Sequence, residues 1–296
     1  MIPEAYITAW RSEAPWASDA QVEQDLILSR MLVEIFNDPD LCDQLAVRGG
    51  TALNKLFLRP ASRYSEDIDL VQTKPGPIGV VLDAIRARVD CLLGRPRRDH
   101  SQGNTTLLYR FNSEIPPVTP LRLKIEINTR EHFTVHGFKR VPLSVTNGWF
   151  SGKADVTTYA IEEILGTKLR ALYQRRKGRD LFDLWLCVER NMADPDKIVA
   201  TFSRYMEEGG KAVSRAEFEA NLYAKRDDPA FLRDIGPLLT PDIMFDPNTA
   251  FQIVHRQIIS RLPGKPWRQA GHDLSLIHIS EPTRPLYISY AVFCLK

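Results

Sequence analysis

The sequence predicts an α+β fold in which strands and helices share the first half of the chain and helices fill the second. Three observations carry this prediction. Residues 21–36 and 78–93 place apolar side chains near helical spacing. Residues 121–128 instead alternate apolar and polar side chains, as a strand with one buried face does. After about residue 158, apolar residues recur at helical spacing, so we expect a helical region there.

Length and composition are those of an ordinary globular protein. The chain has 296 residues, 44% hydrophobic and 26% charged, which suffices for one or two domains with a buried core. Its formal net charge of +2 is too small to indicate a nucleic-acid partner by itself. The 4 cysteines are scattered and form no C-x-x-C pair, which argues against a disulfide framework and a zinc site.

These features favour a protein of the reducing cytoplasm. The N-terminus carries acidic residues and no long apolar core, so no signal peptide is expected. No apolar run approaches the length of a membrane span, so we expect no membrane partner.

The elements expected in the first half alternate between strands and helices. Asp38-Pro39-Asp40 and the stretch 74–77 mark turns. We expect helices at 21–36, 52–58 and 78–93, a basic turn at 94–100, and strands within 41–47 and at 67–72, 105–111, 121–128, 133–135 and 141–145.

In the second half we expect helices at 158–175, from 179 onward, and at 195–206, 214–224, 231–239 and 249–262. The domain division is an N-terminal arm at 1–20, an α/β core at 21–155 and a helical region at 156–272. Residues 273–296 resemble translated sequencing-adapter read-through. We interpret them as a non-native tail that should pack poorly, which would mean that the true C-terminus is missing.

The most informative stretch runs from Arg48 to Leu70. Asp67 and Asp69 stand at i and i+2, so in a strand they project from the same face while Ile68 and Leu70 point into a core. Two converging carboxylates repel each other unless a cation or a proton lies between them. Mg²⁺ suits such hard oxygen ligands, usually with substrate phosphates completing its coordination.

Upstream of the two aspartates, Gly49, Gly50 and Thr51 form a small-residue turn before a short helix. Glycines let the backbone approach a ligand closely, and a helix N-terminus directs free N–H groups at an anion. A phosphate cradle followed by a paired-carboxylate strand is what phosphoryl or nucleotidyl transfer needs. The alternative is a plain glycine turn followed by an edge strand with two solvated aspartates.

The spelling GGTAL, a short helix and then RYSEDIDL resembles the first motif of the AbiEii/AbiGii toxin family. This family is a branch of the DNA polymerase β-like nucleotidyltransferase superfamily. The resemblance covers roughly residues 26–191. It implies a nucleotidyltransferase-like mixed β-sheet flanked by helices, followed by a helical region that completes the active-site cleft.

The polar face of residues 121–128 carries Glu126 beside Lys124. Such a face is often only solvated. Family members place an acidic residue on a later strand of the sheet, however, and Glu126 fits that pattern. The resemblance therefore implies Glu126 as a third metal ligand, with Lys124 near the phosphates.

A second match lies at Lys168, Asp180 and Asp183. Asp180 falls near a helix N-terminus, where a carboxylate is favoured as a simple cap. The resemblance implies instead that Lys168 binds nucleotide phosphates and that Asp180 completes the site. Asp183 lies three residues further on the same helix face, so which of the two acids functions stays open.

The predicted activity is Mg²⁺-dependent nucleotidyl transfer from an NTP. Asp67, Asp69 and Glu126 would hold one or two Mg²⁺ ions, and Lys168 with Arg63 would neutralise the departing pyrophosphate. The predicted catalytic residues are Asp67, Asp69, Lys168 and Asp180. The predicted nucleotide-binding residues are Gly49, Gly50, Thr51, Arg63, Ser65 and Lys168.

The resemblance also implies the toxin of a toxin–antitoxin or abortive-infection pair, with a DNA-binding transcriptional repressor as antitoxin. Some relatives extend the 3′ end of tRNA, so tRNA or another RNA is the expected acceptor. The basic clusters at 95–98 and 170–179 could hold an RNA backbone, although such clusters are usually solvated. Two alternatives remain: transfer to a small molecule or protein, and a non-catalytic module that senses nucleotides or binds partners.

Overall fold

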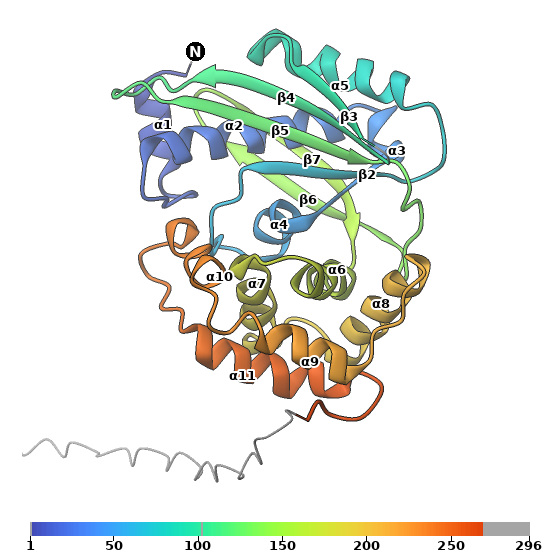
Figure 1. Cartoon of the computed structure of the whole chain (residues 1–296). Coiled ribbons are helices and arrows are strands. Elements are labelled where there is room, and N and C mark those ends of the chain that lie inside the picture. Colours follow the sequence, from blue (N-terminus) through green and yellow to red (C-terminus); the bar gives the residue numbers. More distant parts are fainter. Residues whose placement is uncertain (1, 102, 269–296) are drawn as a thin grey trace, which may run out of the picture.

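A mixed sheet of seven strands forms the centre of the computed structural model, which describes residues 2–101 and 103–268 (Figure 1). The sequence-based expectation for the tail at 273–296 lies outside these residues. The strands are β1 (Leu45–Arg48), β2 (Asp67–Gln72), β3 (Arg97–Ser101), β4 (Asn104–Asn112), β5 (Pro120–Asn128), β6 (Phe138–Thr146) and β7 (Ser151–Tyr159).

The strand order is β3-β4-β5-β2-β1-β7-β6. Two parallel pairings, β2 with β5 and β1 with β7, join three antiparallel groups: the β3–β4–β5 meander, the β1–β2 pair and the β6–β7 hairpin. This topology puts the short strands β1 and β2 in the middle of the sheet. Their side chains are therefore flanked by neighbours on both edges.

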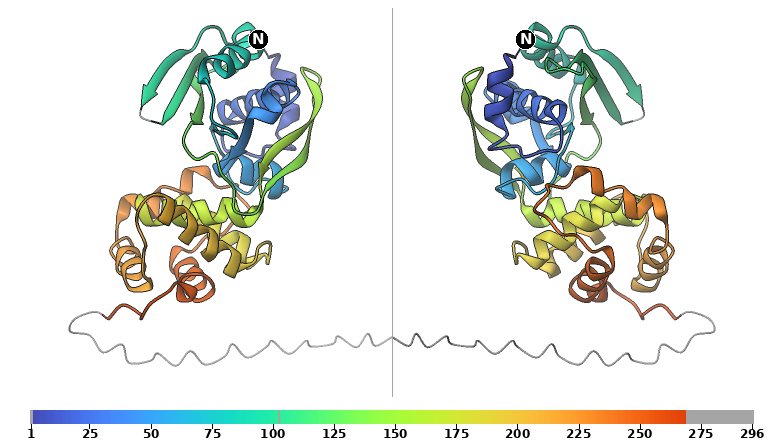
Figure 2. Two further views of the ribbon diagram at one scale, coloured as in Figure 1. Left: turned by 90° about the vertical axis from the view of Figure 1, so that its right-hand side faces the viewer. Right: turned by 90° about the vertical axis from the view of Figure 1, so that its left-hand side faces the viewer.

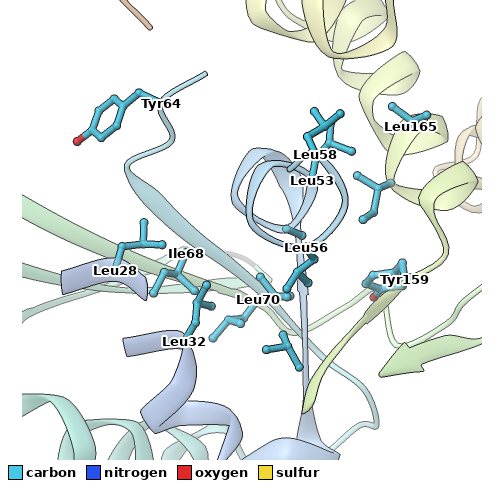
Figure 3. Packing of buried hydrophobic residues seen from close by; sticks show 14 of the residues in the cluster. Leu28, Leu32, Leu53, Leu56, Leu58, Tyr64, Ile68, Leu70, Tyr159 and Leu165 are labelled. Carbon is cyan, nitrogen blue, oxygen red and sulfur yellow. The ribbon is translucent and has the colours of Figure 1, made fainter. Parts of the chain in front are cut away.

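The N-terminal helices are α1 (Glu4–Trp10), α2 (Asp19–Phe36), α3 (Leu41–Gln44), α4 (Gly49–Ala52) and α5 (Ile78–Leu93), with a π-helical turn at Leu53–Phe57 directly after α4. Ser18 and Gln21 form a capping box that begins α2. The apolar residues of α2 pack against Ile68 and Leu70 of β2 (Figure 3). Because strand side chains alternate, this packing turns Asp67 and Asp69 to the opposite face.

The helical region consists of α6 (Ile161–Gln174), α7 (Gly178–Glu189), α8 (Pro195–Glu208), α9 (Arg215–Tyr223), α10 (Pro229–Arg233) and α11 (Pro247–Gln257), with 3₁₀ turns at Gly236–Leu238 and Ile259–Arg261. It lies beyond α4, on the side of the sheet away from α5 (Figures 1 and 2). α4 packs on β1 and β2 and also contacts α6. The helical region therefore faces the same side of β2 as the two aspartates.

The structure corrects several boundaries. The stretch expected as a basic turn contains β3, which pairs with β4 through its backbone although all its side chains are exposed. No strand forms at 133–135, because the amides of Val135 and His136 donate to the carboxylate of Glu163 instead. The helix expected from residue 158 begins at Ile161, since Thr158 still belongs to β7 and pairs with Val47.

The helix expected at 52–58 starts earlier, at Gly49, and continues as the π-helical turn. The glycine pair is thus the first turn of the helix and not a loop before it. The segment expected as one helix at 231–239 is split into α10 and the 3₁₀ turn at Gly236–Leu238. Glycine followed by proline at 236 and 237 explains this break.

Candidate active site

Gly49 and Gly50, which we call the glycine turn, follow β1 directly and form the first turn of α4 at the middle of the sheet. Gly49 has φ +76°, a left-handed conformation that other residues rarely adopt. A Cβ at position 49 would collide with the carboxylate of Asp69, and one at position 50 would collide with the guanidinium of Arg63. Only glycine at position 49 leaves room for the Asp69 carboxylate, and only glycine at position 50 leaves room for the buried Arg63 guanidinium.

Asp67 and Asp69 project from the same face of β2, as predicted, while Ile68 and Leu70 are buried on the other face. The Oδ1 atom of Asp67 is buried and has no hydrogen-bond partner among the described residues. Burial and the neighbouring charge of Asp69 raise the pKa of Asp67 to about 6. A buried, unpartnered carboxylate oxygen beside a second carboxylate is an arrangement that a divalent cation would stabilise, so these residues fit a metal ion.

Glu126 lies next to this pair, because β5 runs parallel to β2 and places Glu126 opposite Asp69 and Lys124 opposite Asp67. Its carboxylate forms an ion pair with Lys124. Across residues 2–101 and 103–268, no group of three or more His, Cys, Asp or Glu side chains is arranged to hold a metal. The structure thus brings Glu126 into register with the aspartates but pairs it with a lysine.

Hydroxyl and amide groups fix the turn to the strand that carries the aspartates. The Oγ atoms of Thr51 and Ser65 are 2.8 Å apart, and Thr51 also donates to the carbonyl oxygen of Asp67. Asn54 donates to the carbonyl oxygen of Gly50 at 3.0 Å and accepts from the backbone N–H of Arg63 at 3.3 Å. Thr51 is completely buried, which makes its observed contacts structural.

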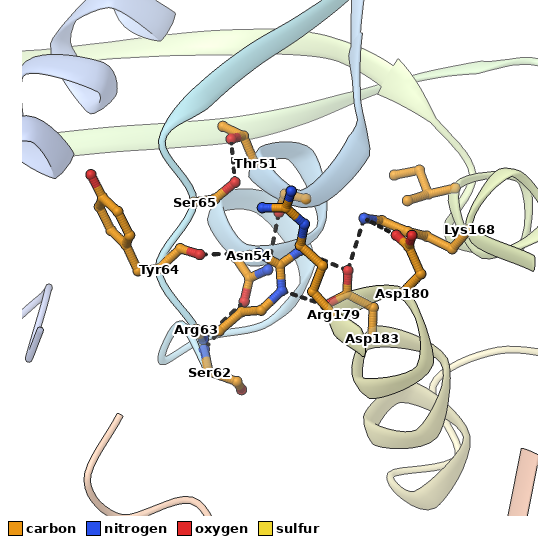
Figure 4. Close-up of polar contacts among 12 residues, drawn as sticks. Thr51, Asn54, Ser62, Arg63, Tyr64, Ser65, Lys168, Arg179, Asp180 and Asp183 are labelled. Carbon is orange, nitrogen blue, oxygen red and sulfur yellow. Dashed lines mark hydrogen bonds and ion pairs between the residues drawn. The ribbon is translucent and has the colours of Figure 1, made fainter. Parts of the chain in front are cut away.

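A buried chain of ion pairs connects this turn to the helical region (Figure 4). Arg63 donates two hydrogen bonds of 2.7 Å to the carboxylate of Asp183. Lys168 Nζ lies 3.0 Å from Asp183 and 3.2 Å from Asp180, between the two acids. Arg175 closes the chain with bonds of 2.8 and 2.9 Å to Asp180. We call this chain of five residues the buried ion-pair network.

The charges in the buried ion-pair network compensate one another. Asp180 and Asp183 are both 0% exposed, and burial alone would raise their pKa values. The charges of Arg63 and Lys168 outweigh burial and lower the pKa of Asp183 to about 2. Lys168 and Arg175 likewise lower the pKa of Asp180. Both acids are therefore ionised, and both position cations at the interface between the sheet and the helical region.

This arrangement shows how the two predicted phosphate-binding cations are held. Arg63 has 2% relative exposure and lies against Gly50, while Lys168 has 5%. Arg63 also donates to the carbonyl oxygen of Tyr64 at 3.0 Å. In this structure both cations therefore contact protein groups, and Arg63 does so directly behind Gly50.

Sequence reasoning missed the individual role of Arg175, which it saw only as one of several basic residues. The side chain of Arg175 is 50% exposed; its hydrogen bond to Asp180 raises its pKa, and the charge of Asp69 adds to this effect. It is thus a cation that reaches solvent and feels the charge of Asp69. The one sequence feature that pointed to this role is that Arg175 stands five residues before Asp180.

A second missed cluster joins Arg48, Glu131 and Arg170. Arg170 donates to Glu131 at 2.6 Å, and Arg48 also forms an ion pair with Glu131. Burial alone would raise the pKa of Glu131, but the hydrogen bond from Arg170 and the charge of Arg48 lower it to about 2. The cluster fastens α6 to the end of β1, directly before the glycine turn.

Most of the other basic residues at 170–179 are also ion-paired. Arg176 lies 3.3 Å from Asp228, and Lys177 lies 3.3 Å from Asp234. The other basic cluster differs, since Arg97 and Arg98 are exposed on β3. The two clusters are thus not equivalent as surfaces for a polyanion.

Replacing Gly49 with alanine should lower activity by about 10²-fold, because the new Cβ would displace the Asp69 carboxylate. The left-handed backbone at position 49 adds about 1–2 kcal/mol of strain. Gly210→Ala is a matched control: Gly210 has φ +73°, but its Cβ would meet no atom within 4 Å. Both variants should lose similar stability in thermal unfolding, and only Gly49→Ala should lose nucleotidyl transfer. Equal activity of the two variants would contradict the assignment of the glycine turn to the active site.

Taken together, the mixed sheet, the glycine turn and the two aspartates define a nucleotidyltransferase. The family model described as the nucleotidyl transferase AbiEii toxin of type IV toxin–antitoxin systems matches residues 30–254. Because this match covers more than half of the 296 residues, the chain belongs to the AbiEii family. Family membership implies an NTP as substrate and an antitoxin as partner.

Solved structures agree on the fold. MenT4, a nucleotidyltransferase toxin from Mycobacterium tuberculosis H37Rv, superposes with a TM-score of 0.59 at 17% identity, covering 89% of this chain and 91% of that one. A candidate nucleotidyltransferase from H. pylori gives 0.50 at 18% identity, covering 80% and 92%. Among curated proteins, no sequence matches the chain. None of the helices in the described residues is long and apolar enough to cross a membrane.

Proposed function

We propose that this protein is a Mg²⁺-dependent toxin that transfers a nucleotide from an NTP to the 3′ end of tRNA. The observation that carries the proposal is the pair Asp67 and Asp69 on one face of β2, beside the glycine turn. The orphaned Oδ1 of Asp67 supports a cation at this point. The AbiEii family supports nucleotidyl transfer and the toxin role.

Asp67 and Asp69 would hold Mg²⁺, and Glu126 would join them if Lys124 released its carboxylate. The bound ion would offset the negative charge of the triphosphate during transfer. Lys124 would then be free to contact the substrate phosphates. The protein itself would position the substrates and supply fixed positive charge. These contributions suit a reaction in which the protein forms no covalent bond to the substrate.

The triphosphate would lie against the turn at Gly49 and Gly50, where backbone N–H groups of the first turn of α4 are available. The hydroxyl of Ser65 borders the same turn. Arg175, which reaches solvent, would contact the departing pyrophosphate. Lys168 and Arg63 would add positive charge from behind the turn, with Asp180 and Asp183 holding them in place.

In the reaction, a 3′ hydroxyl oxygen of the acceptor forms a bond to the α-phosphorus of the NTP. The bond between that phosphorus and the bridging oxygen breaks, and pyrophosphate leaves with the bonding electron pair. The hydroxyl proton passes to solvent or to a carboxylate of the site. The acceptor thereby gains one nucleotide and can no longer be charged normally with an amino acid.

The test is to incubate the purified protein with Mg²⁺, each labelled NTP in turn and total bacterial tRNA. The control is the Asp67→Ala/Asp69→Ala variant, checked for folding by circular dichroism. Label on tRNA that depends on the two aspartates is the expected result, and it identifies the nucleotide. Label on the protein itself or on a small molecule would replace the tRNA assignment. Nucleotide binding without any transfer would favour a sensing module.

A further inference from the structure

We propose that one face of strands β3 to β5 binds the sugar-phosphate backbone of the RNA acceptor and leads it to Asp67. The inference rests on the proposed function only in taking the acceptor to be RNA. The surface consists of Arg97 on β3, Arg110 on β4, and Arg122 and Lys124 on β5. We call it the basic sheet face.

Strand register places these four side chains on the same side of the sheet as Asp67. Lys124 is opposite Asp67 across β5 and β2, and Leu108 is opposite Lys124 across β4 and β5. Arg97 is opposite Leu108, which completes one row of side chains across four strands. Directly opposite residues in neighbouring strands share a face. The row therefore runs from the sheet edge at Arg97 to the catalytic aspartate.

A second row lies beside the first. Arg110 and Arg122 are directly opposite each other on β4 and β5, two residues along from Leu108 and Lys124 and hence on the same face. Arg122 is 62% exposed, and its ion-pair partner Glu66 is 3.5 Å away. Like charges directly opposite each other are unfavourable in a sheet unless an anion lies over them. The arrangement is therefore suited to a phosphate.

The outer arginines have no competing partner. In the described part of the chain, Arg97 and Arg110 are exposed and form no ion pair. On β3 to β5 the acids of this face are Glu126, which is paired with Lys124, and Asp99, which is exposed on β3. Asp67 and Asp69 of β2 lie at the inner end of the same face, and Glu66 lies beside Arg122. Within β3 to β5 the four basic side chains thus outnumber the two acidic ones, and the unpaired positive charge lies at Arg97 and Arg110.

The opposite face of the same strands is occupied by the core. Leu107 and Tyr109 are buried there, and the Tyr109 hydroxyl donates to Asp90 of α5 at 2.9 Å. Figure 2 shows the β3–β4 hairpin standing out from the body of the molecule, clear of the helical region. A strand of nucleic acid can therefore approach the basic sheet face from solvent and continue to the two aspartates.

This geometry supplies a matched pair of variants. Arg97 and Arg98 are adjacent on β3, both exposed and both without an ion pair among the described residues, but they project from opposite faces. Arg98 pairs in register with Leu107 and so lies on the α5 side. Changing either one to glutamate alters the net charge of the protein by the same amount. A difference in tRNA affinity between the two variants would therefore result from the face on which the charge lies and not from the net charge.

The experiment measures binding of fluorescently labelled tRNA by anisotropy, without NTP and in EDTA, over a series of salt concentrations. We expect Arg97→Glu and Arg110→Glu each to weaken binding on the order of 10-fold and to lower the salt slope by about one. Arg98→Glu should change affinity less than about 3-fold. Thermal unfolding of each variant checks that the fold is retained.

Three outcomes would overturn the inference. They are wild-type affinity in Arg97→Glu and Arg110→Glu, an equal loss in Arg98→Glu, and no tRNA binding by the wild type. Because binding is measured without NTP, the inference and the proposed function fail separately. A wild type that binds tRNA through Arg97 but transfers no nucleotide would keep the surface and reject the reaction. A wild type that transfers nucleotide independently of Arg97 and Arg110 would keep the reaction and reject the surface.

Discussion

Replacing Asp69 with asparagine should reduce nucleotidyl transfer by about 10³-fold or more while leaving the fold intact. The substitution keeps the shape of the side chain but removes the charge that lies against Gly49. A loss of this size corresponds to about 4 kcal/mol of transition-state stabilisation. The measurement is the initial rate of label incorporation into tRNA at saturating NTP and Mg²⁺.

A matched control for this variant is Asp155→Asn, because Asp155 is an exposed strand residue on β7. It should retain wild-type activity, since Asp155 pairs with Pro142 of β6 and lies three residues before Thr158, where β7 pairs with β1. Direct titration with Mn²⁺ provides a readout besides turnover, and Asp69→Asn should bind the ion more weakly than Asp155→Asn. A folded Asp69→Asn protein with wild-type turnover would reject the assignment of the active site.

The second large effect is expected on stability. Replacing Asp183 with asparagine should cost about 3–5 kcal/mol of the free energy of unfolding. The variant would leave Arg63 without its carboxylate partner and deprive Lys168 of one of two, and these cations have only 2% and 5% relative exposure. An unpaired charge at such a position cannot recover the hydration that it has in the unfolded chain. Urea denaturation measures the difference.

Asp43→Asn is the control for this variant. Asp43 also pairs with an arginine, Arg140 at 2.6 Å, but the two side chains are 71% and 60% exposed. Exposed ion pairs contribute about 0–1 kcal/mol, so Asp43→Asn should be close to wild type. Equal stability of the two variants would mean that the buried ion-pair network contributes nothing to the fold.

The same comparison has a defined pH dependence. The pKa of Asp183 is lowered from 3.8 to about 2 in the folded protein, so its stabilising contribution is fully present above the higher value. The contribution is lost as the pH falls through the folded pKa. The difference in stability between wild type and Asp183→Asn should therefore shrink between about pH 4 and pH 2. A difference that stays constant over this range would show that the carboxylate charge is not responsible.

Local patterns were enough to predict much of the fold. Helices with a clear apolar face, such as 78–93, were placed correctly because their burial follows from spacing alone. The sequence did not reveal β3, whose five side chains are all exposed and whose stability comes from backbone pairing with β4. It also could not show that a carboxylate, Glu163, replaces a neighbouring strand for the amides at 135 and 136.

For the site, the sequence predicted the pairing of Asp67 and Asp69 on one face, and the structure confirms that geometry. This was possible because i and i+2 are related by strand geometry alone. Contacts between distant segments were beyond such reasoning. Arg63 and Asp183 are 120 residues apart, and nothing in either segment identifies the other as its partner. The ion pair between Lys124 and Glu126 likewise depends on side-chain conformations that spacing does not determine.

The place of β1 in the sheet bears on how this enzyme could be divided. β1 is four residues long, and it pairs with β2 on one side and with β7 on the other. The Thr158 hydroxyl also donates to the carbonyl oxygen of Val47 at 2.7 Å. The predicted boundary between the α/β core and the helical region, at 155/156, falls within β7. A fragment ending there would expose the edge of β1, which could then pair with other chains. A gene fusion or domain exchange that keeps this sheet intact would therefore have to include both the sheet and the helical region.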